Sequence, residues 1–251
     1  MNESQHPDER QARLQLAACY RVFALLGWTE MIYNHITVRL PASVSGAARQ
    51  FLINPFGQHY SEVTASNLVK IDLQGKVLDG SSYPVNPAGF LVHAAIHDRM
   101  PRAHCVMHTH TTAGVAVACL QGGLQQSNFY SAQLHDMVAY HDFEGITIHA
   151  DEAPRLLKNI GNKPAVILRN HGLLAWGATL PQTFVTLWTL QRACEIQLAT
   201  LSMGAAIPVS SAVAQKCTHD SLQFDAKFGA GRDVFDAMRR LVDKTDVSYQ
   251  Q

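Results

Sequence analysis

The order of apolar and polar positions predicts short strands and helices that alternate irregularly along the chain. An apolar stretch interrupted by Arg21 is typical of an amphipathic helix that ends at Gly27, and the polar residues 1–13 before it are expected to form a tail. Short apolar runs with small polar turns between them favour antiparallel strands. In this first part of the chain the expected strands are Ile36–Leu40, Phe51–Ile53 and Val69–Asp72.

The second part of the chain is expected to place longer helices between its strands. Asn86 as N-cap and Pro87 at the first helical position open a helix that ends near Met100. The spacing of Thr179 and Gln182 is typical of a capping box that opens a long helix ending near residue 204. The remaining expected elements are helices at 111–120, 151–161 and 233–242, and strands around 105–110, 137–140, 147–149, 165–168 and 173–176.

Length and charge limit the domain count and the class of partner. The chain has 251 residues, of which 47% are hydrophobic, so it can bury one large core, and no break in composition divides it. We expect one domain at residues 14–204, followed by a helical segment, 205–251, that packs on the domain or on a neighbouring subunit. Twenty basic and twenty acidic residues give a net charge of zero, which disfavours nucleic acid or an anionic membrane as partner. A small molecule is the expected partner.

Cysteine usage and hydropathy indicate the compartment. The five cysteines form no Cys-x-x-Cys pair, which disfavours a disulfide framework and a thiolate zinc site. The longest apolar run, Ala113–Leu120, is far shorter than the ~20 residues of a membrane span. The polar start of the chain differs from a signal peptide. We therefore expect a cytoplasmic protein.

Three histidines are the strongest candidates for chemistry. His108 and His110 alternate on a predicted strand, so both imidazoles project from one face and stand close enough to share a divalent ion. His171 lies in the tight turn expected between two further strands. Three nitrogen ligands with an open position are typical of a catalytic metal centre. Spacing alone leaves the alternative of surface or hydrogen-bonded core histidines open.

Two further histidines, His93 and His97, lie four residues apart on the helix expected after Pro87. They share one helix face, and the commoner role for such a pair is hydrogen bonding within the core. We therefore interpret them as core histidines and exclude them from the set of metal ligands.

Four motifs, in this order, resemble the class II aldolase and adducin family. The resemblance spans about residues 14–201, and the motifs are Asn34-His35-Ile36-Thr37-Val38-Arg39, Asn54-Pro55-Phe56-Gly57, His108-Thr109-His110 and Asn170-His171-Gly172. It implies a three-layer α/β/α fold with a mainly antiparallel central sheet. It also implies a homo-oligomer, with a tetramer expected, because many members of the family assemble with active sites at subunit boundaries.

The resemblance implies a metal and its ligands. Enzymes of the family hold a divalent ion, often zinc, through the histidines that correspond to His108, His110 and His171. Zinc is the expected ion, and manganese, cobalt, nickel and iron also accept nitrogen ligands. The ion in such enzymes binds carbonyl and hydroxyl oxygens and stabilises the enolate formed when an adjacent bond breaks.

The resemblance also implies residues that contact substrate. Asn34 and Gly57 match positions that cradle the anionic end of the substrate, although both residue types also favour turns. Tyr140 resembles a tyrosine that lines the cleft of family enzymes, which makes it the candidate catalytic acid or base. An ordinary buried or rim tyrosine is the alternative for that position.

One position departs from the pattern of the sugar-phosphate aldolases, in which a glutamate preceded by two serines stands four residues before a helix histidine. Here Gly89 stands four residues before His93, and Pro87 and Ala88 replace the serines. Gly89 is expected to line the substrate site. The missing acid/base, typically worth ~10²–10⁴-fold in rate, disfavours retro-aldol cleavage.

Two functions therefore compete. The first is a metal-dependent lyase, of decarboxylase or aldolase type, that acts on a small oxo- or hydroxy-carboxylate or a sugar-like substrate through a metal-stabilised enolate. The second is a non-catalytic adducin-like binding protein with actin-type partners, in which the metal is structural or vestigial. The three histidines favour the first function, and the Asn-Pro-Ala-Gly-Phe stretch, which resembles the adducin-like branch, favours the second.

Overall fold

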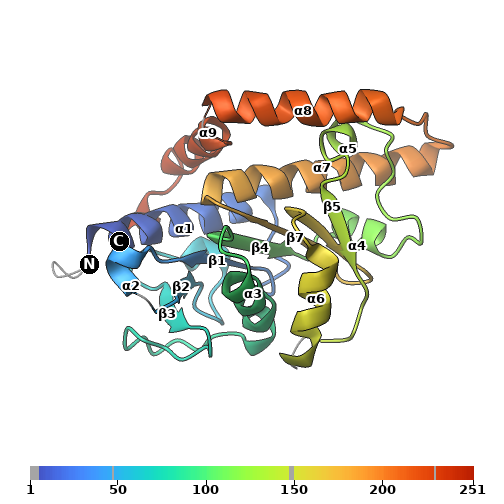
Figure 1. The fold of residues 1–251 in the computed structure, drawn as a ribbon. Coiled ribbons are helices and arrows are strands. Elements are labelled where there is room, and N and C mark those ends of the chain that lie inside the picture. The colour runs from blue at the N-terminus through green and yellow to red at the C-terminus, as the bar shows by residue number, and fades with distance from the viewer. Residues whose placement is uncertain (1–5, 47, 147–149, 229) are drawn as a thin grey trace.

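The fold is a seven-stranded sheet between two layers of helices (Figure 1). It is described by a computed structural model over residues 6–46, 48–146, 150–228 and 230–251. This arrangement confirms the predicted three-layer α/β/α fold. The strand expected at 147–149 lies outside the described residues.

The sheet is mainly antiparallel, as predicted, and its order is β3-β2-β1-β4-β7-β6-β5. Only the pair of β5 and β6 runs parallel among the described strands, and all other neighbours are antiparallel. The central position of β4 puts its residues among the most buried of the chain. The strands are β1 (His35–Arg39), β2 (Gln50–Ile53), β3 (Val69–Asp72), β4 (Cys105–Thr109), β5 (Val138–His141), β6 (Ala165–Leu168) and β7 (Gly172–Gly177).

Helices cover both faces of the sheet. One face packs against α1 (Pro7–Leu26) and α7 (Leu180–Met203), and the other packs against α3 (Pro87–Arg99) and α6 (Ala153–Ile160) (Figure 1). None of the helices in the described part of the chain is both long and apolar enough to cross a bilayer. The shorter helices are α2 (Ala42–Ser45), α4 (Thr112–Ala118), α5 (Phe129–Gln133), η1 (Tyr60–Glu62), η2 (Ala150–Glu152) and η3 (Ser248–Gln250).

The first helix begins earlier than expected, because α1 starts at Pro7 and includes much of the supposed polar tail. Arg13 is 4% exposed and donates to Glu9 at 2.9 Å and to the carbonyl of Leu68 at 2.6 Å. Because charged residues are usually exposed, hydropathy alone predicts a solvated segment even where two charged side chains are buried as an ion pair. Residues 7–13 are therefore helical, with Glu9 and Arg13 buried and most of the other residues of this stretch exposed.

The C-terminal segment lies against the outer surface of the α1 and α7 layer. Helix α8 (Ser211–Phe228) packs on α5, and α9 (Arg232–Asp243) packs on α1 and α7 (Figure 1). Phe235 of α9 meets Phe184 of α7 with ring centroids 5.7 Å apart. The chain end is held by the Ala65 amide, which donates to the carbonyl of Tyr249 at 2.8 Å.

The capping box predicted at the start of α7 is only half formed. The Thr179 side chain accepts from the Gln182 amide at 3.2 Å, as the motif requires. The Gln182 side chain, however, accepts from the amide of Ala178 in place of that of Thr179.

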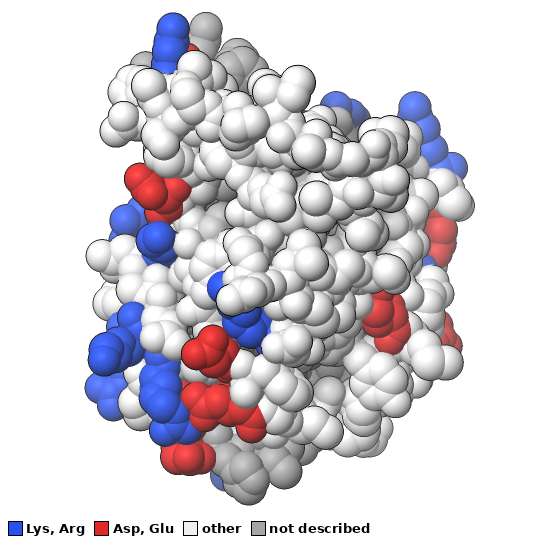
Figure 2. Space-filling model, turned by 90° about the vertical axis from the view of Figure 1, so that its right-hand side faces the viewer, with Lys and Arg blue, Asp and Glu red and all other residues white. Residues whose placement is uncertain are grey.

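Figure 2 shows the side of the molecule that lies at the right of Figure 1. Basic and acidic side chains lie at its edges and in a mixed group at the lower left that reaches toward the middle, and much of the remaining face is uncharged. The end of α7 and the segment after it expose the apolar side chains of Leu198, Leu201, Met203 and Ile207. This face presents no broad field of one sign, in keeping with the balanced charge of the chain.

Candidate metal centre

Three histidines meet at one end of the central strands. His108 is in β4, and His110 follows one residue after the strand ends, so alternation turns both rings to the same side. Their Nε2 atoms are 2.7 Å apart. His171 lies in the tight turn between β6 and β7, and its Nε2 is 2.9 Å from that of His110. We call His108, His110 and His171 the histidine triad.

The turn that carries His171 requires its flanking residues. Asn170 has a φ of +56°, a conformation that asparagine tolerates better than most residues. A Cβ on Gly172 would lie 2.3 Å from the carbonyl oxygen of Thr109, so only glycine allows β7 to approach β4 this closely. The Asn-His-Gly sequence therefore brings His171 to the strand end.

The triad fits a divalent ion. Its three candidate ligand atoms all lie within 4.8 Å of one another. Bonds of about 2.1 Å in a tetrahedral site would separate neighbouring nitrogens by about 3.4 Å, so the two close nitrogen pairs need to move apart by only about 0.5–0.7 Å. The Nδ1 of His108 donates to the carbonyl of Leu173 at 2.8 Å, which leaves Nε2 as a lone pair directed at the other two rings.

Burial keeps these imidazoles neutral. Burial lowers the pKa of His108 well below its usual value, and it lowers the pKa of His110 in the same direction. Burial, followed by the proximity of His110, lowers the pKa of His171 to about 4. Near neutral pH the triad therefore offers unprotonated nitrogens, the form that binds metal.

The triad opens into a cavity of about 480 Å³. Apolar side chains, among them Phe56, Phe143 and Leu168, form much of its wall, and the amides of Asn86 and Asn170 add polar groups. None of the described residues that line it is Asp, Glu, Lys or Arg. A divalent ion held by neutral ligands would therefore be the main charge in this cavity and would favour an anionic ligand.

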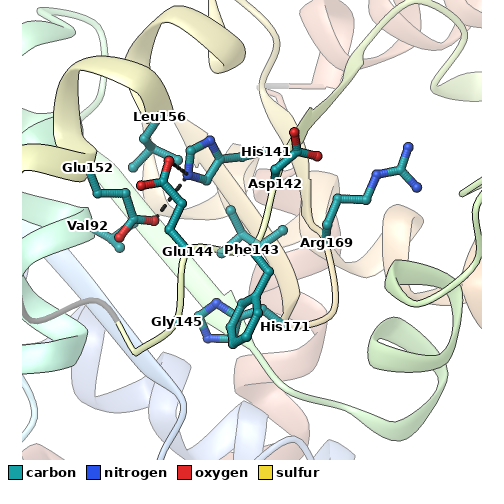
Figure 3. Close-up of a pocket in the computed structure, with 11 residues that line it drawn as sticks. Val92, His141, Asp142, Phe143, Glu144, Gly145, Glu152, Leu156, Arg169 and His171 are labelled. Atoms are coloured by element: carbon teal, nitrogen blue, oxygen red, sulfur yellow. Dashed lines mark hydrogen bonds and ion pairs between the residues drawn. The ribbon is translucent and has the colours of Figure 1, made fainter.

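Carboxylates near the triad point elsewhere. Figure 3 shows Phe143 against His171, with ring centroids 6.1 Å apart, and shows Glu144 and Glu152 directed at His141. The Glu152 carboxylate accepts from His141 Nε2 at 3.1 Å, and Glu144 also pairs with Arg155 at 2.8 Å. These contacts hold the loop after β5 beside the triad without placing a charge in the cavity.

The predicted substrate residues are dispersed. Gly89 lines the cavity. Asn34 is 1% exposed, and its Oδ1 accepts from the backbone amide of His110 at 2.8 Å, so it positions a triad residue from behind. Gly57, with a φ of +99°, is not among the described residues that line the cavity, although its neighbour Phe56 is.

Tyr140 lies away from the triad of its own chain. Its hydroxyl accepts from the amide of Leu124 at 3.0 Å, and the Arg169 guanidinium lies 4.3 Å from its ring centroid. It lines a separate cavity beside Gln125. The assignment of Tyr140 as a catalytic residue stays a prediction, and within one chain the geometry does not bring it to the histidines.

Sequence reasoning missed His35, which lies on the wall of the cavity. His35 pairs with His108 in the register of β1 and β4, and their ring centroids are 5.0 Å apart. Alternation along β1 puts His35 and Thr37 on the face that packs against α3, where His93 and His97 also point. The sequence did carry a signal for this cluster: His35 and Thr37 are two residues apart on a strand, and His93 and His97 are four residues apart on a helix, so each pair shares one face.

Comparisons with known proteins identify the family to which this fold belongs. A family model described as Class II Aldolase and Adducin N-terminal domain matches residues 14–198. Alpha-adducin of Mus musculus is 46% identical over 197 residues, which are 77% of this chain and 26% of that protein.

Two solved structures cover almost the whole chain. The crystal structure of an aldolase II superfamily protein from Pseudomonas syringae has a TM-score of 0.88 and 35% identity, covering 98% of both chains. L-fuculose 1-phosphate aldolase from Glaciozyma antarctica PI12 has a TM-score of 0.84 and 25% identity, covering 100% of this chain and 96% of that one. Because the family model spans most of the chain and a structural relative matches it nearly end to end, this protein belongs to the class II aldolase and adducin family.

Proposed function

We propose that this protein is a divalent-metal-dependent carbon–carbon lyase that acts on a small oxo- or hydroxy-carboxylate. The observation that carries the proposal is the cavity, in which three neutral imidazoles converge and no described lining residue is charged. Members of the family typically use a divalent metal. The ion, when bound, supplies Lewis acidity that stabilises negative charge on a substrate oxygen.

The residues of the chain hold and insulate the site. The carbonyl of Leu173 fixes the ring of His108, and Asn34 fixes the backbone of His110, so two of the three ligands are oriented before any ion binds. The apolar wall around Phe143 and Leu168 lowers the local dielectric, which strengthens electrostatic contacts with an anionic substrate. The cavity is therefore suited to bind an acid and to stabilise charge that develops on its oxygens.

Decarboxylation fits this cavity better than aldol cleavage. In decarboxylation the bond between the carboxyl group and its neighbouring carbon breaks, the electron pair stays with the substrate, and a proton from water completes the product. Retro-aldol cleavage instead needs a base strong enough to take the proton of a substrate hydroxyl. No described lining residue is a carboxylate, and burial lowers the pKa of the His35 imidazole on the cavity wall well below its usual value, so that ring can accept a hydrogen bond but is a weak base. By the resemblance of the sequence before His93, Gly89 corresponds to the glutamate that serves as that base in the sugar-phosphate aldolases.

The ion, the assembly and the compartment complete the proposal. Zinc suits three nitrogen ligands and a fourth open position, and manganese, cobalt, nickel or iron are outcomes of the metal analysis. All five cysteines are free, which fits a cytoplasmic protein. A homotetramer is proposed from the family, with the exposed apolar end of α7, Leu198 and Leu201, as part of the surface available for assembly.

A second function is supported by one finding. Alpha-adducin is 46% identical to this protein over a region that covers 77% of this chain. An adducin-like protein would bind a partner such as actin through this domain and would turn over no oxo acid. Catalysis therefore separates the two functions, because a structural metal would give the adducin-like protein the same metal content as the lyase.

The first experiment measures metal per chain in tag-free protein, for wild type and for His171→Ala. We expect about one ion per chain in the wild type and almost none in the variant, with His135→Ala as a matched histidine control that keeps its metal. Release of carbon dioxide is then followed over a panel of oxo acids. Wild-type protein that gains no metal on reconstitution, or metal-loaded protein that releases no carbon dioxide from any acid, would contradict the lyase proposal.

A further inference from the structure

A chain of buried polar side chains runs from the cavity wall into the interface between β1 and α3. Its members are His35 and Thr37 of β1 and His93 and His97 of α3, and all four are buried. We call this set the histidine relay. Each member bonds to the next, so the position of one proton at the inner end fixes the positions of the others.

The inner end of the relay is anchored on a backbone carbonyl. A carbonyl oxygen can only accept, so His97 Nδ1 donates to Ala103, 2.9 Å away. Burial lowers the pKa of His97 to about 3, so the ring is neutral and its Nε2 must accept. The donor to Nε2 is the Thr37 hydroxyl at 2.7 Å.

The direction of the bonds continues outward from Thr37. Its single hydroxyl proton is engaged with His97, so its oxygen accepts from Nδ1 of His93 at 2.7 Å. Burial also keeps His93 neutral, and its Nε2 therefore accepts from Nδ1 of His35 at 2.9 Å. The outermost atom, Nε2 of His35, is left as an unprotonated acceptor.

That acceptor occupies the space of the absent side chain at Gly89. A Cβ on Gly89 would lie 2.5 Å from Cδ2 and 2.8 Å from Nε2 of His35. Both residues line the cavity of the triad. Among the described residues, only the three histidines of the triad are close enough together to hold one ion. His35 therefore lies beside the candidate metal ligands but is not one of them.

We propose that His35 contacts the substrate and accepts a hydrogen bond from one of its hydroxyl groups, which makes this cavity selective for hydroxylated acids. Thr37, His93 and His97 are positioning residues that keep Nε2 of His35 as an acceptor. The inference rests on the proposed function for the acid and its metal, and it adds the hydroxyl donor. A buried acceptor left without a donor is destabilised, so an acid that lacks the hydroxyl binds less tightly.

The first test reads the proton directly. In metal-free protein labelled with nitrogen-15 at histidine, with His35→Gln used to assign the resonance, Nε2 of His35 is expected at the shift of an unprotonated nitrogen. A proton on that atom in the wild type would overturn the inference. Thr37→Val, which removes the hydroxyl at nearly constant volume, is expected to mix the two tautomers, and Thr37→Ser is expected to restore the single one.

The second test uses two acids that differ by one hydroxyl, glycerate and lactate, on zinc-loaded protein. We expect glycerate to bind about tenfold more tightly in the wild type and in Thr37→Ser, a difference of about 1.4 kcal/mol, which is the size of one net hydrogen bond. The preference should largely disappear in Thr37→Val with its metal content unchanged. Equal binding of the two acids by the wild type, or a glycerate complex that leaves the Nε2 resonance of His35 unmoved, would overturn the substrate contact.

The two proposals fail in different ways. Failure of the lyase proposal appears as protein without metal or as absence of carbon dioxide release, and neither result changes the proton reading on His35. Failure of the present inference appears as a protonated Nε2 or as indifference to the hydroxyl in protein that still holds its metal.

Discussion

The histidine triad and the histidine relay lie side by side, and both are built from buried rings, yet their nitrogens are partnered in opposite ways. In the triad three Nε2 atoms face one another. The Nε2 atoms of His108 and His110 are 2.7 Å apart, and the Nε2 of His108 is unprotonated and offers a lone pair. In the relay each nitrogen of His93 and His97 bonds to a protein group. Acceptors that face one another without donors can be stabilised by a bound cation, whereas in the relay each donor already has an acceptor within the protein.

The backbone explains the difference. The triad draws on a strand end and a tight hairpin turn, two places where side chains reach an open cavity. The relay lies between a central strand and the helix packed across it, and its partners are a threonine and a backbone carbonyl. Burial alone therefore does not identify a metal ligand, and the partner of each ring nitrogen does.

Acid should weaken folding through the relay, and this is the largest effect we expect. An unfolded chain protonates His97 below its usual pKa of about 6.5, while the folded protein resists protonation until about pH 3. Its contribution is therefore complete above pH 6.5 and is lost as pH falls toward 3. The loss is about 1.4 kcal/mol per pH unit, or on the order of 5 kcal/mol in all.

Denaturant unfolding of metal-free protein at several pH values measures this slope. The groups facing His97 are the stacked ring of Phe51, the cationic Arg39, which also disfavours the protonated form, and His104. His97→Gln can still donate to Ala103 and accept from Thr37, but it cannot titrate. Between pH 6.5 and pH 3 the unfolding free energy of this variant should change less steeply with pH than that of the wild type, by the amount expected for one proton fewer taken up on unfolding. An unchanged slope would show that His97 is not held neutral.

Much of this architecture was predictable from local patterns, and the failures have identifiable causes. The helix after Asn86 and the strand before His110 follow from capping and alternation, which depend on near neighbours. The supposed tail failed because Arg13 is buried by partners far along the chain. The contact between His35 and His93 joins two residues that are 58 positions apart in the sequence, and no local pattern contains that pairing.

The candidate site divides in the same way. The triad could be predicted because a motif resemblance joins His108 and His171 across 62 intervening positions of sequence. Asn34 came from the same resemblance, but its contact with the backbone of His110 is a matter of packing that residue type alone does not reveal. Tyr140 was proposed from its place in the chain, and its bond to Leu124 turns it toward another cavity.

Removing the support behind the triad should have an intermediate effect. Asn34→Ala leaves the backbone amide of His110 without its acceptor and frees the ring to move. Outer supports of this kind typically contribute ten- to a hundredfold to metal affinity, so we expect a loss of about tenfold or more. Competition with a chromophoric chelator measures it.

Asn159→Ala is the matched control for that measurement. Asn159 also bonds to a histidine, His141, at 3.0 Å, but that ring is outside the triad. Its affinity for metal should equal that of the wild type. Equal losses in the two variants would mean that Asn34 acts through general stability and does not orient a ligand.

The smallest effect tests how firmly the relay holds its outermost ring. Gly89→Ala places a methyl group 2.5 Å from Cδ2 of His35, so one of the two must move. Overpacking costs about 1–3 kcal/mol, and alanine returns up to about 1 kcal/mol of helix propensity in α3, so the expected net loss of stability is about 1 kcal/mol.

The same substitution in a His35→Ala background separates steric conflict from helix propensity. Without the imidazole, Gly89→Ala meets no ring and should stabilise the helix, so the two substitutions should show a coupling energy of about 1–3 kcal/mol. Equal effects in both backgrounds would mean that the ring of His35 swings aside at no cost. A freely moving ring could not keep Nε2 directed at a ligand, so the coupling energy also measures how well the relay prepares the cavity for the hydroxyl it is proposed to select.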